Sequence, residues 1–471
     1  MMQNYCLRFF SLIILSLNIL NAQSEKNRIN FIVINADDLG YGDLSSFGHP
    51  TINTPNLDRM VAEGQKWTQF YAGSSVCTPS RAALITGRLA VRSGLTSDKE
   101  RVLFPDSHYG ISFNEITIAE QLKKANYKTA CIGKWHLGHQ KKYLPLQHGF
   151  DYYFGIPYSN DMDIPLSEIK KNGGYWKFIS NPENNKIENF RVPLIKNNQI
   201  IELPANQKNI TRRYSEETIR FIKNNVDKPF FIYLAHNLPH VPLFASKKAL
   251  GKSKRGLYGD VVEEIDNGIG EILKTLEKEG IDRNTLVVFT SDNGPWTVFK
   301  EQGGSSGPFH AGKGTTWEGG MRVPTVFWLP EKISPGIINQ IGSAMDLFHT
   351  FSKLVGVPIP NDRIIDSYDL SPTLFKNQKS SRDFIFYYRG TQLYALRLGE
   401  FKAHFITQGE YGEFGEKIIH DPPLLYNLNH DPSEKYNIID KHPEIIEKIK
   451  ALAKKHKDKM VLGKDLLRKR G

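Results

Sequence analysis

The chain has 471 residues, of which 40% are hydrophobic and 24% are charged, and its formal net charge is +11. The length allows two domains with sizeable cores, or one large domain with an appendage. The composition is ordinary for a soluble globular protein, which excludes a low-complexity chain. The positive charge favours acidic partners but excludes none of nucleic acid, anionic lipid and sulfated polysaccharide.

The first 22 residues are predicted to be a signal peptide. Arg8 supplies a positive charge, residues 9–20 are apolar, and Ala22 is the small residue that a cleavage site needs. The apolar run is too short to span a membrane comfortably, although an uncleaved anchor is the alternative. We therefore expect an exported protein, periplasmic or secreted, with no stable membrane anchor.

Four short apolar runs predict buried strands, because they are rich in β-branched and aromatic residues. They cover residues 29–35, 128–132, 230–234 and 285–290. The polar residues that follow them are Asp37-Asp38, Lys134 with His136, His236, and Asp292-Asn293. Helical patterns lie between the runs, at residues 116–125, 215–225 and 260–279.

Alternating strands and helices predict an α/β fold with a large, mostly parallel central sheet flanked by helices. In such sheets, ligands bind beyond the carboxyl ends of the strands. All four polar sets follow strand ends, so we expect them to converge on one crevice.

A smaller C-terminal α+β subdomain is predicted after residue 365. Short strands at residues 383–388, 393–397, 401–405 and 422–426 favour an antiparallel sheet, and residues 443–455 favour an amphipathic helix. We expect a catalytic domain over residues 23–365 and a C-terminal subdomain over residues 366–471. The basic tail is interpreted as a solvated or frayed end.

Two cysteines follow the signal segment, Cys77 and Cys131. A disulfide between them is one possibility in an exported protein. Cys131 lies in an apolar run and is interpreted as a buried core thiol. The neighbours of Cys77 favour a different role for that residue.

Cys77 is predicted to lie at the start of a helix. Thr78 is a suitable N-cap, Pro79 suits the first helical position, and Gly87 can end the helix. The free N–H groups and the helix dipole favour an anion there, and Arg81 can turn back toward it. A plain thiolate would be activated at this position.

The Asp37-Asp38 and Asp292-Asn293 pairs are hard oxygen ligands at two strand ends. They suit Ca²⁺ or Mg²⁺ rather than Zn²⁺, which prefers His or Cys. Each pair taken alone is also compatible with a turn or a cap. Taken together with the Cys77 segment, the two pairs favour a metal site.

The run from Cys77 to Arg88 resembles the signature of the type I sulfatases, C-x-P-S-R followed by x-x-L-x-T-G-R. Residues 133–138, Gly-Lys-Trp-His-Leu-Gly, match the second signature of that family. The resemblance extends from about residue 29 to about residue 437 and is strongest to the arylsulfatase A-like branch. It implies an alkaline-phosphatase/sulfatase-like sandwich.

The resemblance also implies a set of cofactors and roles. A maturation enzyme would oxidise Cys77 to formylglycine (3-oxoalanine), and the hydrate of this aldehyde would attack sulfur. Asp37, Asp38, Asp292, Asn293 and residue 77 would bind Ca²⁺. The catalytic set would be Cys77, Arg81, Lys134, His136 as the base, His236 as the acid, and Lys313, with Ser159 near the sulfate. Further sugar-binding candidates adjoin these motifs in sequence, namely His139, Asn160, Asp161, His240, Trp296, His310 and Arg389.

The resulting hypothesis is a sulfuric ester hydrolase that removes sulfate from a sulfated carbohydrate of the galactose or galactosamine type. Its expected partners are that carbohydrate and the formylglycine-generating enzyme, with no nucleic acid. Two alternatives stay open. One is a phosphonate or phosphate monoester hydrolase of the same superfamily, and the other is a non-catalytic glycan-binding protein.

Overall fold

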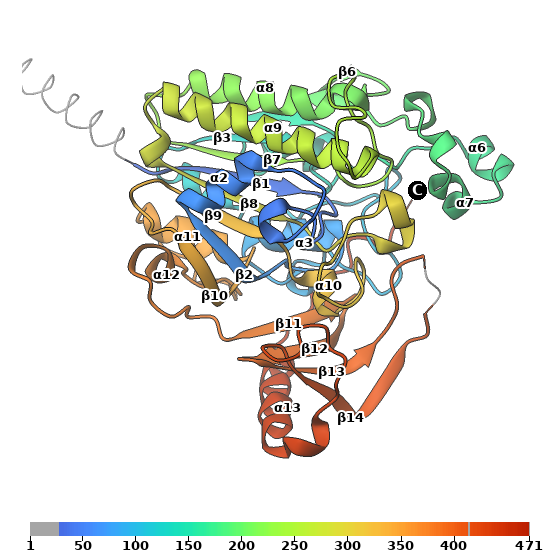
Figure 1. Ribbon diagram of the computed structural model, residues 1–471, viewed down its shortest axis with the longest axis vertical. Helices are drawn as coiled ribbons and strands as arrows, with labels where there is room; N and C mark the ends of the chain where they lie inside the picture. Colours follow the sequence, from blue (N-terminus) through green and yellow to red (C-terminus); the bar gives the residue numbers. More distant parts are fainter. Residues whose placement is uncertain (1–27, 413–414, 471) are drawn as a thin grey trace, which may run out of the picture.

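The computed structural model describes residues 28–412 and 415–470. The signal peptide expected at residues 1–22 lies outside this part of the chain. Within it, no helix is both long and apolar enough to cross a membrane. Figure 1 shows a large α/β body above a smaller part formed by the C-terminal strands and α13 (Pro443–Asp458).

The large body is built on a ten-stranded sheet, with the order β10-β2-β9-β8-β1-β7-β3-β4-β5-β6. The strands are β1 (Asn30–Ala36), β2 (Gln65–Tyr71), β3 (Lys128–Gly133), β4 (Tyr152–Gly155), β5 (Leu194–Lys196), β6 (Gln199–Glu202), β7 (Phe230–Ala235), β8 (Thr285–Ser291), β9 (Thr325–Trp328) and β10 (Gly336–Ser343). Only β5 and β9 run antiparallel to both of their neighbours. The prediction of a large, mostly parallel sheet is therefore confirmed.

The four predicted strands are β1, β3, β7 and β8, and they lie side by side in the order β8-β1-β7-β3. Their carboxyl ends are level, because Ala36 pairs with Ser291 while Ala235 pairs with both Asn35 and Gly133. Polar residues that are far apart in sequence therefore emerge at one edge of the sheet.

Side chains along β1 alternate between two hydrophobic clusters, as the twofold period of a strand requires. Ile32 and Ile34 belong to one cluster, and Phe31 and Val33 belong to the other. All four side chains are fully buried. The near-continuous hydrophobicity of β1 therefore reflects a sheet that is covered on both faces.

The helices of the described residues are α2 (Pro55–Glu63), α3 (Cys77–Thr86), α4 (Ala90–Ser93), α5 (Ile118–Lys123), α6 (Leu166–Lys171), α7 (Tyr175–Ser180), α8 (Ile210–Lys223), α9 (Leu257–Lys278), α10 (Glu318–Met321), α11 (Asp346–Leu354), α12 (Ser371–Lys376) and α13. Helices α2, α8 and α9 cover one face of the sheet, and α3, α5, α11 and α12 cover the other. The helix predicted at residues 215–225 begins earlier, at Ile210.

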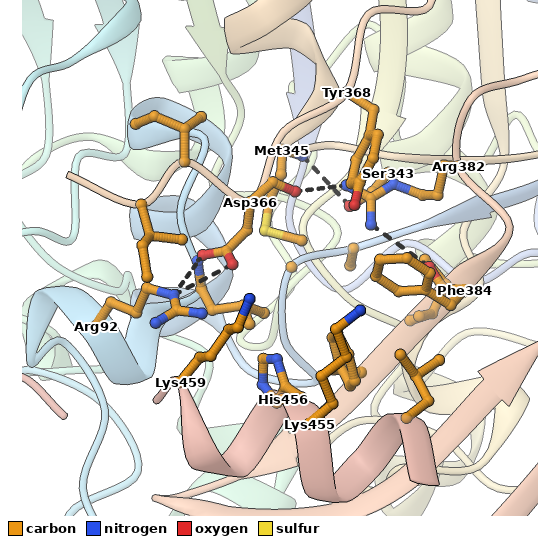
Figure 2. Close-up of a pocket in the computed structure, with 18 residues that line it drawn as sticks. Arg92, Ser343, Met345, Asp366, Tyr368, Arg382, Phe384, Lys455, His456 and Lys459 are labelled. Carbon is orange, nitrogen blue, oxygen red and sulfur yellow. Dashed lines mark hydrogen bonds and ion pairs between the residues drawn. The ribbon is translucent and has the colours of Figure 1, made fainter. Parts of the chain in front are cut away.

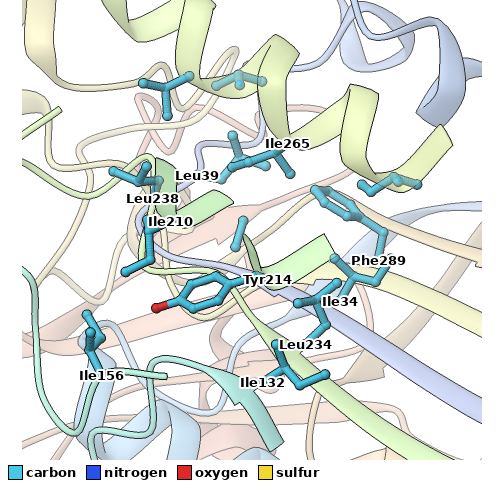
Figure 3. Packing of buried hydrophobic residues seen from close by; sticks show 14 of the residues in the cluster. Ile34, Leu39, Ile132, Ile156, Ile210, Tyr214, Leu234, Leu238, Ile265 and Phe289 are labelled. Carbon is cyan, nitrogen blue, oxygen red and sulfur yellow. The ribbon is translucent and has the colours of Figure 1, made fainter. Parts of the chain in front are cut away.

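The packing under α8 and α9 is apolar throughout. Figure 3 shows Ile34, Leu234 and Phe289 of the sheet lying beneath Ile210 and Tyr214 of α8 and Ile265 of α9. Such burial stabilises the fold by about 25 cal/mol per Å² of apolar surface removed from water. The core therefore supplies a rigid base for the loops at the strand ends.

The C-terminal part contains the predicted antiparallel sheet, in the order β11-β12-β13-β14. Its strands are β11 (Phe384–Arg389), β12 (Gln392–Leu398), β13 (Phe401–Thr407) and β14 (Ile418–Asn427). The buried carboxylate of Glu318 in α10 joins this sheet to the large body. It accepts hydrogen bonds from Tyr71 at 2.6 Å, from Tyr387 at 2.8 Å and from Lys402 at 2.9 Å.

The domain boundary at residue 365 stays a prediction. Leu370 and Leu374, which follow it, are fully buried in the cluster beneath the large sheet. Helix α12 thus packs with the catalytic body rather than with the C-terminal sheet.

The interpretation of the basic tail as a frayed end is wrong for residues 460–470, although the side chains of Arg468, Lys469 and Arg470 are exposed to solvent as predicted. The segment returns to the large body, where Gly463 N–H donates to the Val91 carbonyl at 2.8 Å and Leu466 N–H donates to the Gly94 carbonyl at 2.9 Å. Leu467 is fully buried in the core. The basic residues around Leu467 obscure this apolar anchor in the sequence.

Candidate functional site

Two acidic pairs meet where β1 and β8 end. Asp38 N–H donates to Asp292 Oδ1 at 3.2 Å, and Asn293 Nδ2 donates to Asp38 Oδ1 at 2.7 Å. Asp37 is fully buried beside them. The parallel register of β1 and β8 therefore brings the four predicted metal ligands together.

Cys77 is the first residue of α3, and its Sγ lies 3.4 Å from Asp37 Oδ1. Gly87 ends the helix as predicted, with a left-handed φ of 66° and a hydrogen bond from its N–H to the Ala83 carbonyl. Thr78, however, is not the N-cap. Thr78 already lies within the helix, and Val76 is the N-cap. The Thr78 hydroxyl instead donates to the His136 carbonyl at 3.0 Å and accepts from Leu103 N–H at 3.1 Å.

The surroundings of Cys77 do not favour the plain thiolate that a helix start alone would activate. Burial raises the pKa of the Cys77 thiol, and the negative charge of Asp37 raises it further. Lys134 and Lys313 oppose this shift but do not overcome it. The helix N-terminus alone is too weak to offset the loss of water and the adjacent carboxylate. Cys131, in β3, is a fully buried thiol, and both cysteines are free rather than joined by a disulfide.

Three buried cations interleave with these carboxylates. Arg81 Nε donates to Asp292 Oδ2 at 2.8 Å, and Lys313 Nζ donates to Asp38 Oδ2 at 2.7 Å. Lys134 Nζ contacts Asp37 and also donates to Ser159 Oγ at 3.1 Å. The cations come from α3, from the end of β3 and from a distant loop, so only the fold assembles them.

The electrostatics of the carboxylates differ according to their partners. Burial raises the pKa of Asp37, but Lys134 and Arg81 outweigh burial and hold the pKa well below its usual range. Burial raises the pKa of Asp292 to about 7, and repulsion from Asp37 contributes to this shift. Three buried cations therefore balance the three carboxylates, although the pKa of Asp292 stays raised.

The donor atoms fit a hard cation. Cys77 Sγ with oxygens of Asp37 and Asp292, and Cys77 Sγ with Asp38 and His240, form two groups whose atoms lie within 4.8 Å of one another. Asn293 Oδ1 is buried and accepts no hydrogen bond within the described part of the chain. An amide oxygen left without a donor, beside three carboxylates, is a suitable ligand for Ca²⁺.

His136 and His240 both line a narrow pocket of about 20 Å³ beside Cys77. His136 Nε2 lies 2.8 Å from the Leu103 carbonyl, whereas its Nδ1 has no partner among residues 28–412 and 415–470. His240 Nε2 lies 3.5 Å from Asp38 Oδ2. Burial lowers the pKa of each histidine, and the charge of Lys134 lowers that of His136 further.

The structure does not bring His236 to this pocket. Its ring lies on the α8 side of the sheet, with its centroid 6.1 Å from that of Tyr214. Burial alone lowers the pKa of His236 to about 3. His240, four residues later on the same loop, occupies the pocket position that the sequence analysis gave to His236.

The other sugar-binding candidates divide between the pocket and its surroundings. Ser159, Asp161 and Trp296 line the pocket. Asn160 instead donates to the carbonyls of His240, at 3.4 Å, and Pro242, at 3.2 Å, so it supports the loop that carries His240. His310 is exposed and packs edge-on against Trp317, outside the pocket.

Five lining residues were not predicted from the sequence, and two of them, Arg101 and Tyr411, have polar side chains; the others are Val76, Val102 and Met162. The Arg101 guanidinium lies 5.2 Å from the Trp176 ring and 5.8 Å from the Trp296 ring, in cation–π contacts. Tyr411 lies under Arg389, at 4.4 Å. Neither residue stands in a recognisable motif, so no sequence signal could have identified them.

A separate cavity of about 360 Å³ lies between the large body and α13. Figure 2 shows Lys455 and His456 of α13, and Lys459 directly after it, facing Arg92, Asp366 and Arg382. Arg92 is paired with Asp366 at 2.9 Å, and Arg382 is paired with Asp346 at 2.6 Å. None of the predicted site residues lines this cavity, which therefore belongs to the contact between the two parts of the molecule.

Comparison with known proteins gives a consistent result for both parts of the chain. The family model described as "Sulfatase" matches residues 29–357, and the model described as "C-terminal region of aryl-sulfatase" matches residues 380–471. The chain is 38% identical to N-acetylgalactosamine-6-sulfatase of Canis lupus familiaris, over 97% of this chain and 91% of the relative. It is also 38% identical to arylsulfatase A of Homo sapiens, over 90% of this chain and 86% of the relative.

Solved structures support the same assignment. The PsFucS1 sulfatase from Pseudoalteromonas sp. has a TM-score of 0.82 and 29% identity, covering 96% of this chain and 95% of that chain. The phosphonate monoester hydrolase of Agrobacterium radiobacter has a TM-score of 0.59 at 20% identity, covering 91% of this chain and 96% of that chain. The second likeness concerns the fold alone.

Proposed function

This chain belongs to the sulfatase family and is a sulfuric ester hydrolase, and we propose that its substrate is a sulfated carbohydrate whose sulfate group binds in the pocket beside Cys77. One observation carries the proposal. Cys77 and Lys313 line one buried pocket together with two histidines, and Lys134 contacts Asp37 and the pocket residue Ser159 beside it. Preorganised cations of this kind stabilise the charge that develops on sulfate oxygens in the transition state.

We further propose that Cys77 is oxidised to formylglycine by a separate maturation enzyme. Membership of the sulfatase family supports this, because the C-x-P-S-R signature is intact at Cys77. One hydroxyl of the aldehyde hydrate would be the nucleophile that attacks sulfur. The second hydroxyl would then lose its proton, so that the carbonyl re-forms and the C–O bond to sulfate breaks.

Asp37, Asp38, Asp292 and Asn293 would hold Ca²⁺, together with residue 77. The accepting Asn293 Oδ1 and the three carboxylates support this assignment. The ion would supply positive charge that polarises the sulfate group and the residue 77 oxygen. Arg81 would fix the ligand set by its bond to Asp292 and its approach to Asp37, at 3.5 Å.

The two pocket histidines would divide the proton transfers. A carbonyl oxygen can only accept, so the contact with Leu103 places a proton on His136 Nε2 and leaves Nδ1 as a free base. The Val241 carbonyl contacts His240 Nδ1 and places a proton there, so Nε2, which faces Asp38 and the pocket, would donate a proton to the leaving alcohol from the imidazolium form. We therefore assign the acid role to His240 in place of His236.

The carbohydrate class is inferred from relatives. Those at 38% identity include enzymes named N-acetylgalactosamine-6-sulfatase, which supports a galactosamine- or galactose-type sulfate ester. Export through residues 1–22, to the periplasm or the exterior, is part of the same proposal.

Two measurements test the proposal. Intact-mass analysis of the Cys77 peptide, after co-expression with a formylglycine-generating enzyme, should show the mass of the aldehyde or its hydrate. A thiol mass in an active preparation would exclude this nucleophile.

Steady-state kinetics should give a higher kcat/KM for an aryl sulfate than for the matching aryl phosphate. A phosphate preference would favour the phosphoester alternative instead. Absence of turnover on every sulfate ester, with Cys77 fully converted, would favour a glycan-binding protein.

A further inference from the structure

A cavity of about 410 Å³ adjoins the catalytic pocket and shares Arg101, Asp161 and Met162 with it. The catalytic pocket itself, at about 20 Å³, holds only a small group. The rest of a substrate must therefore lie outside it. The adjoining cavity falls in the range of about 300–1,000 Å³ that is usual for ligand sites.

One wall of this cavity comes from residues 460–470, which we call the C-terminal strap. Arg470 lines the cavity, and its guanidinium lies 4.2 Å above the Phe104 ring. Its Nε donates to Asp106 at 2.9 Å, and its Nη1 lies 3.3 Å from Glu100. In Figure 1 the chain end marked C lies beside α6 and α7, far from α13, although the strap follows α13 directly in sequence.

The strap is anchored along its length. Ser97 Oγ donates to Asp465 at 2.6 Å, and His108 N–H donates to the Lys469 carbonyl at 3.1 Å. Gly94 has a φ of +73°, and a Cβ there would lie 1.9 Å from the Lys464 carbonyl oxygen. A close backbone approach, together with the buried Leu467, therefore fixes the strap against residues 91–108.

The same segment positions catalytic groups. Leu103 contacts His136 Nε2 through its carbonyl and Thr78 through its N–H. Arg101 and Val102 line the catalytic pocket. The strap therefore secures the loop that shapes both the pocket and the cavity.

The cavity's own chemistry indicates its ligand. Tyr175 offers an aromatic ring of the kind that packs against the apolar face of a pyranose, whereas the Phe104 ring carries the Arg470 guanidinium. A carboxylate can accept two hydrogen bonds from neighbouring sugar hydroxyls, and a guanidinium group can donate two to them. The charged lining residues are Arg101, Arg470, Asp106, Asp161 and Asp163. Three carboxylates against two guanidinium groups nearly cancel, so the cavity does not favour a second sulfate group.

We propose that the C-terminal strap completes a saccharide subsite, which binds an uncharged sugar ring adjoining the scissile sulfate. This inference rests on the proposed function, because it takes the sulfate pocket as the reacting end of the substrate. It makes Arg470 a residue that determines substrate preference.

The test compares Arg470→Ala with Arg468→Ala, a matched control in the same strap. Arg468 is exposed, and its only hydrogen bond in the described residues is through its backbone. The substrates are an unsubstituted aryl sulfate and a disaccharide with one sulfated galactosamine and one unsulfated sugar. Loss of a charge-assisted contact should raise KM for the disaccharide about tenfold in Arg470→Ala. The rise in KM for the disaccharide should exceed any change in the aryl sulfate kinetics of Arg470→Ala, and the whole Arg468→Ala profile should match that of the wild type.

Failure of the subsite and failure of the proposed function would give different results. An unchanged disaccharide KM in Arg470→Ala, or an equal loss on both substrates, would overturn the subsite. A disaccharide with a second sulfate on the neighbouring sugar should bind less well than the mono-sulfated one, and the reverse order would also overturn it. If the wild type cleaves no sulfate ester, the proposed function fails. Calorimetric titration of the mono-sulfated disaccharide into the wild type and Arg470→Ala then decides the subsite separately, since equal affinities would refute it.

Discussion

The Thr78 hydroxyl donates a hydrogen bond of 3.0 Å to the backbone carbonyl of His136, and so joins the helix that begins at Cys77 to the histidine beside it. The same hydroxyl accepts from Leu103 N–H at 3.1 Å. One small side chain therefore holds three segments that are distant in sequence. His136 itself has a positive φ of 58°, which this bond helps to maintain.

We expect Thr78→Val to lower the free energy of unfolding by about 1–3 kcal/mol, because it leaves a buried N–H and a buried carbonyl without this partner. Thr86→Val is the matched control on the same helix, since Thr86 bonds only to the Ala82 carbonyl within that helix. Denaturant unfolding measures both variants. Equal losses in the two would show that the Thr78 contacts have no special weight.

Cys77→Ala should abolish turnover while leaving the fold nearly intact. The side chain is small and buried, and only its Sγ contact with Asp37 is lost. Steady-state kinetics and the Tm are the measurements, with Cys131→Ala as the control because Cys131 lies in the core away from the pocket. Full activity in Cys77→Ala would refute the nucleophile assignment.

His240→Gln should reduce kcat for an alkyl sulfate by about 10²–10⁴-fold, because a poor leaving group needs a proton donor. The reduction should be much smaller for an aryl sulfate with a good leaving group. His236→Gln should leave both rates within a few-fold of the wild type, since its ring does not line the pocket. The opposite pattern would restore the acid role to His236.

Ca²⁺ should raise the Tm of the protein, and exhaustive chelation should lower it and remove activity. Binding to the folded state stabilises it by about 2.7 kcal/mol when the free ion is at 100 times its Kd. Asn293→Ala should weaken the effect, because the accepting amide oxygen is lost. A Tm that does not respond to Ca²⁺ or to chelation would contradict the metal site.

Acidification should lower the free energy of unfolding, because His456 is buried at the contact between α13 and the large body. Burial, together with the charges of Arg92 and Lys457, lowers the pKa of His456 to about 4, and Asp366 partly opposes this shift. In the unfolded chain the pKa returns to about 6.5, so protons bind the unfolded state more readily. This contribution is complete above pH 6.5 and is lost as the pH falls toward 4.

His456→Gln should therefore make the Tm less dependent on pH between 7 and 4.5. Glutamine can still hydrogen-bond the Tyr388 hydroxyl, which lies 2.9 Å from His456 Nε2. His430→Gln, at an exposed position, should leave the pH dependence as it is in the wild type. An unchanged slope in His456→Gln would refute the assignment.

Much of the fold could be predicted because local patterns carry it. The apolar runs of β1, β3, β7 and β8 need a sheet buried on both faces, and their polar successors follow at fixed positions. Gly87 ends α3 because its left-handed conformation is open to glycine. The acidic pairs and the Lys134-to-His136 segment meet because parallel strands end at one edge.

Other features could not be predicted in this way. The pKa of Cys77 depends on its burial and on Asp37, which lies on another strand. Arg101 lies at the pocket among aromatic rings from two segments distant in sequence, Tyr175 and Trp176 of α7 and Trp296 after β8. Neither the pKa of Cys77 nor the placement of Arg101 can be predicted from the residues adjacent to it in the sequence.

The sequence by itself determined the family, the central sheet and the nucleophile segment, because these depend on short-range periodicity and on residues at fixed spacing. Only the tertiary structure decided that His240 rather than His236 enters the pocket, and that residues 460–470 pack against the loop carrying Arg101. The position of His240 depends on the conformation of the loop after β7, and the packing of residues 460–470 depends on the path of the chain after α13. That path is set by packing between residues hundreds of positions apart, and no local pattern encodes it.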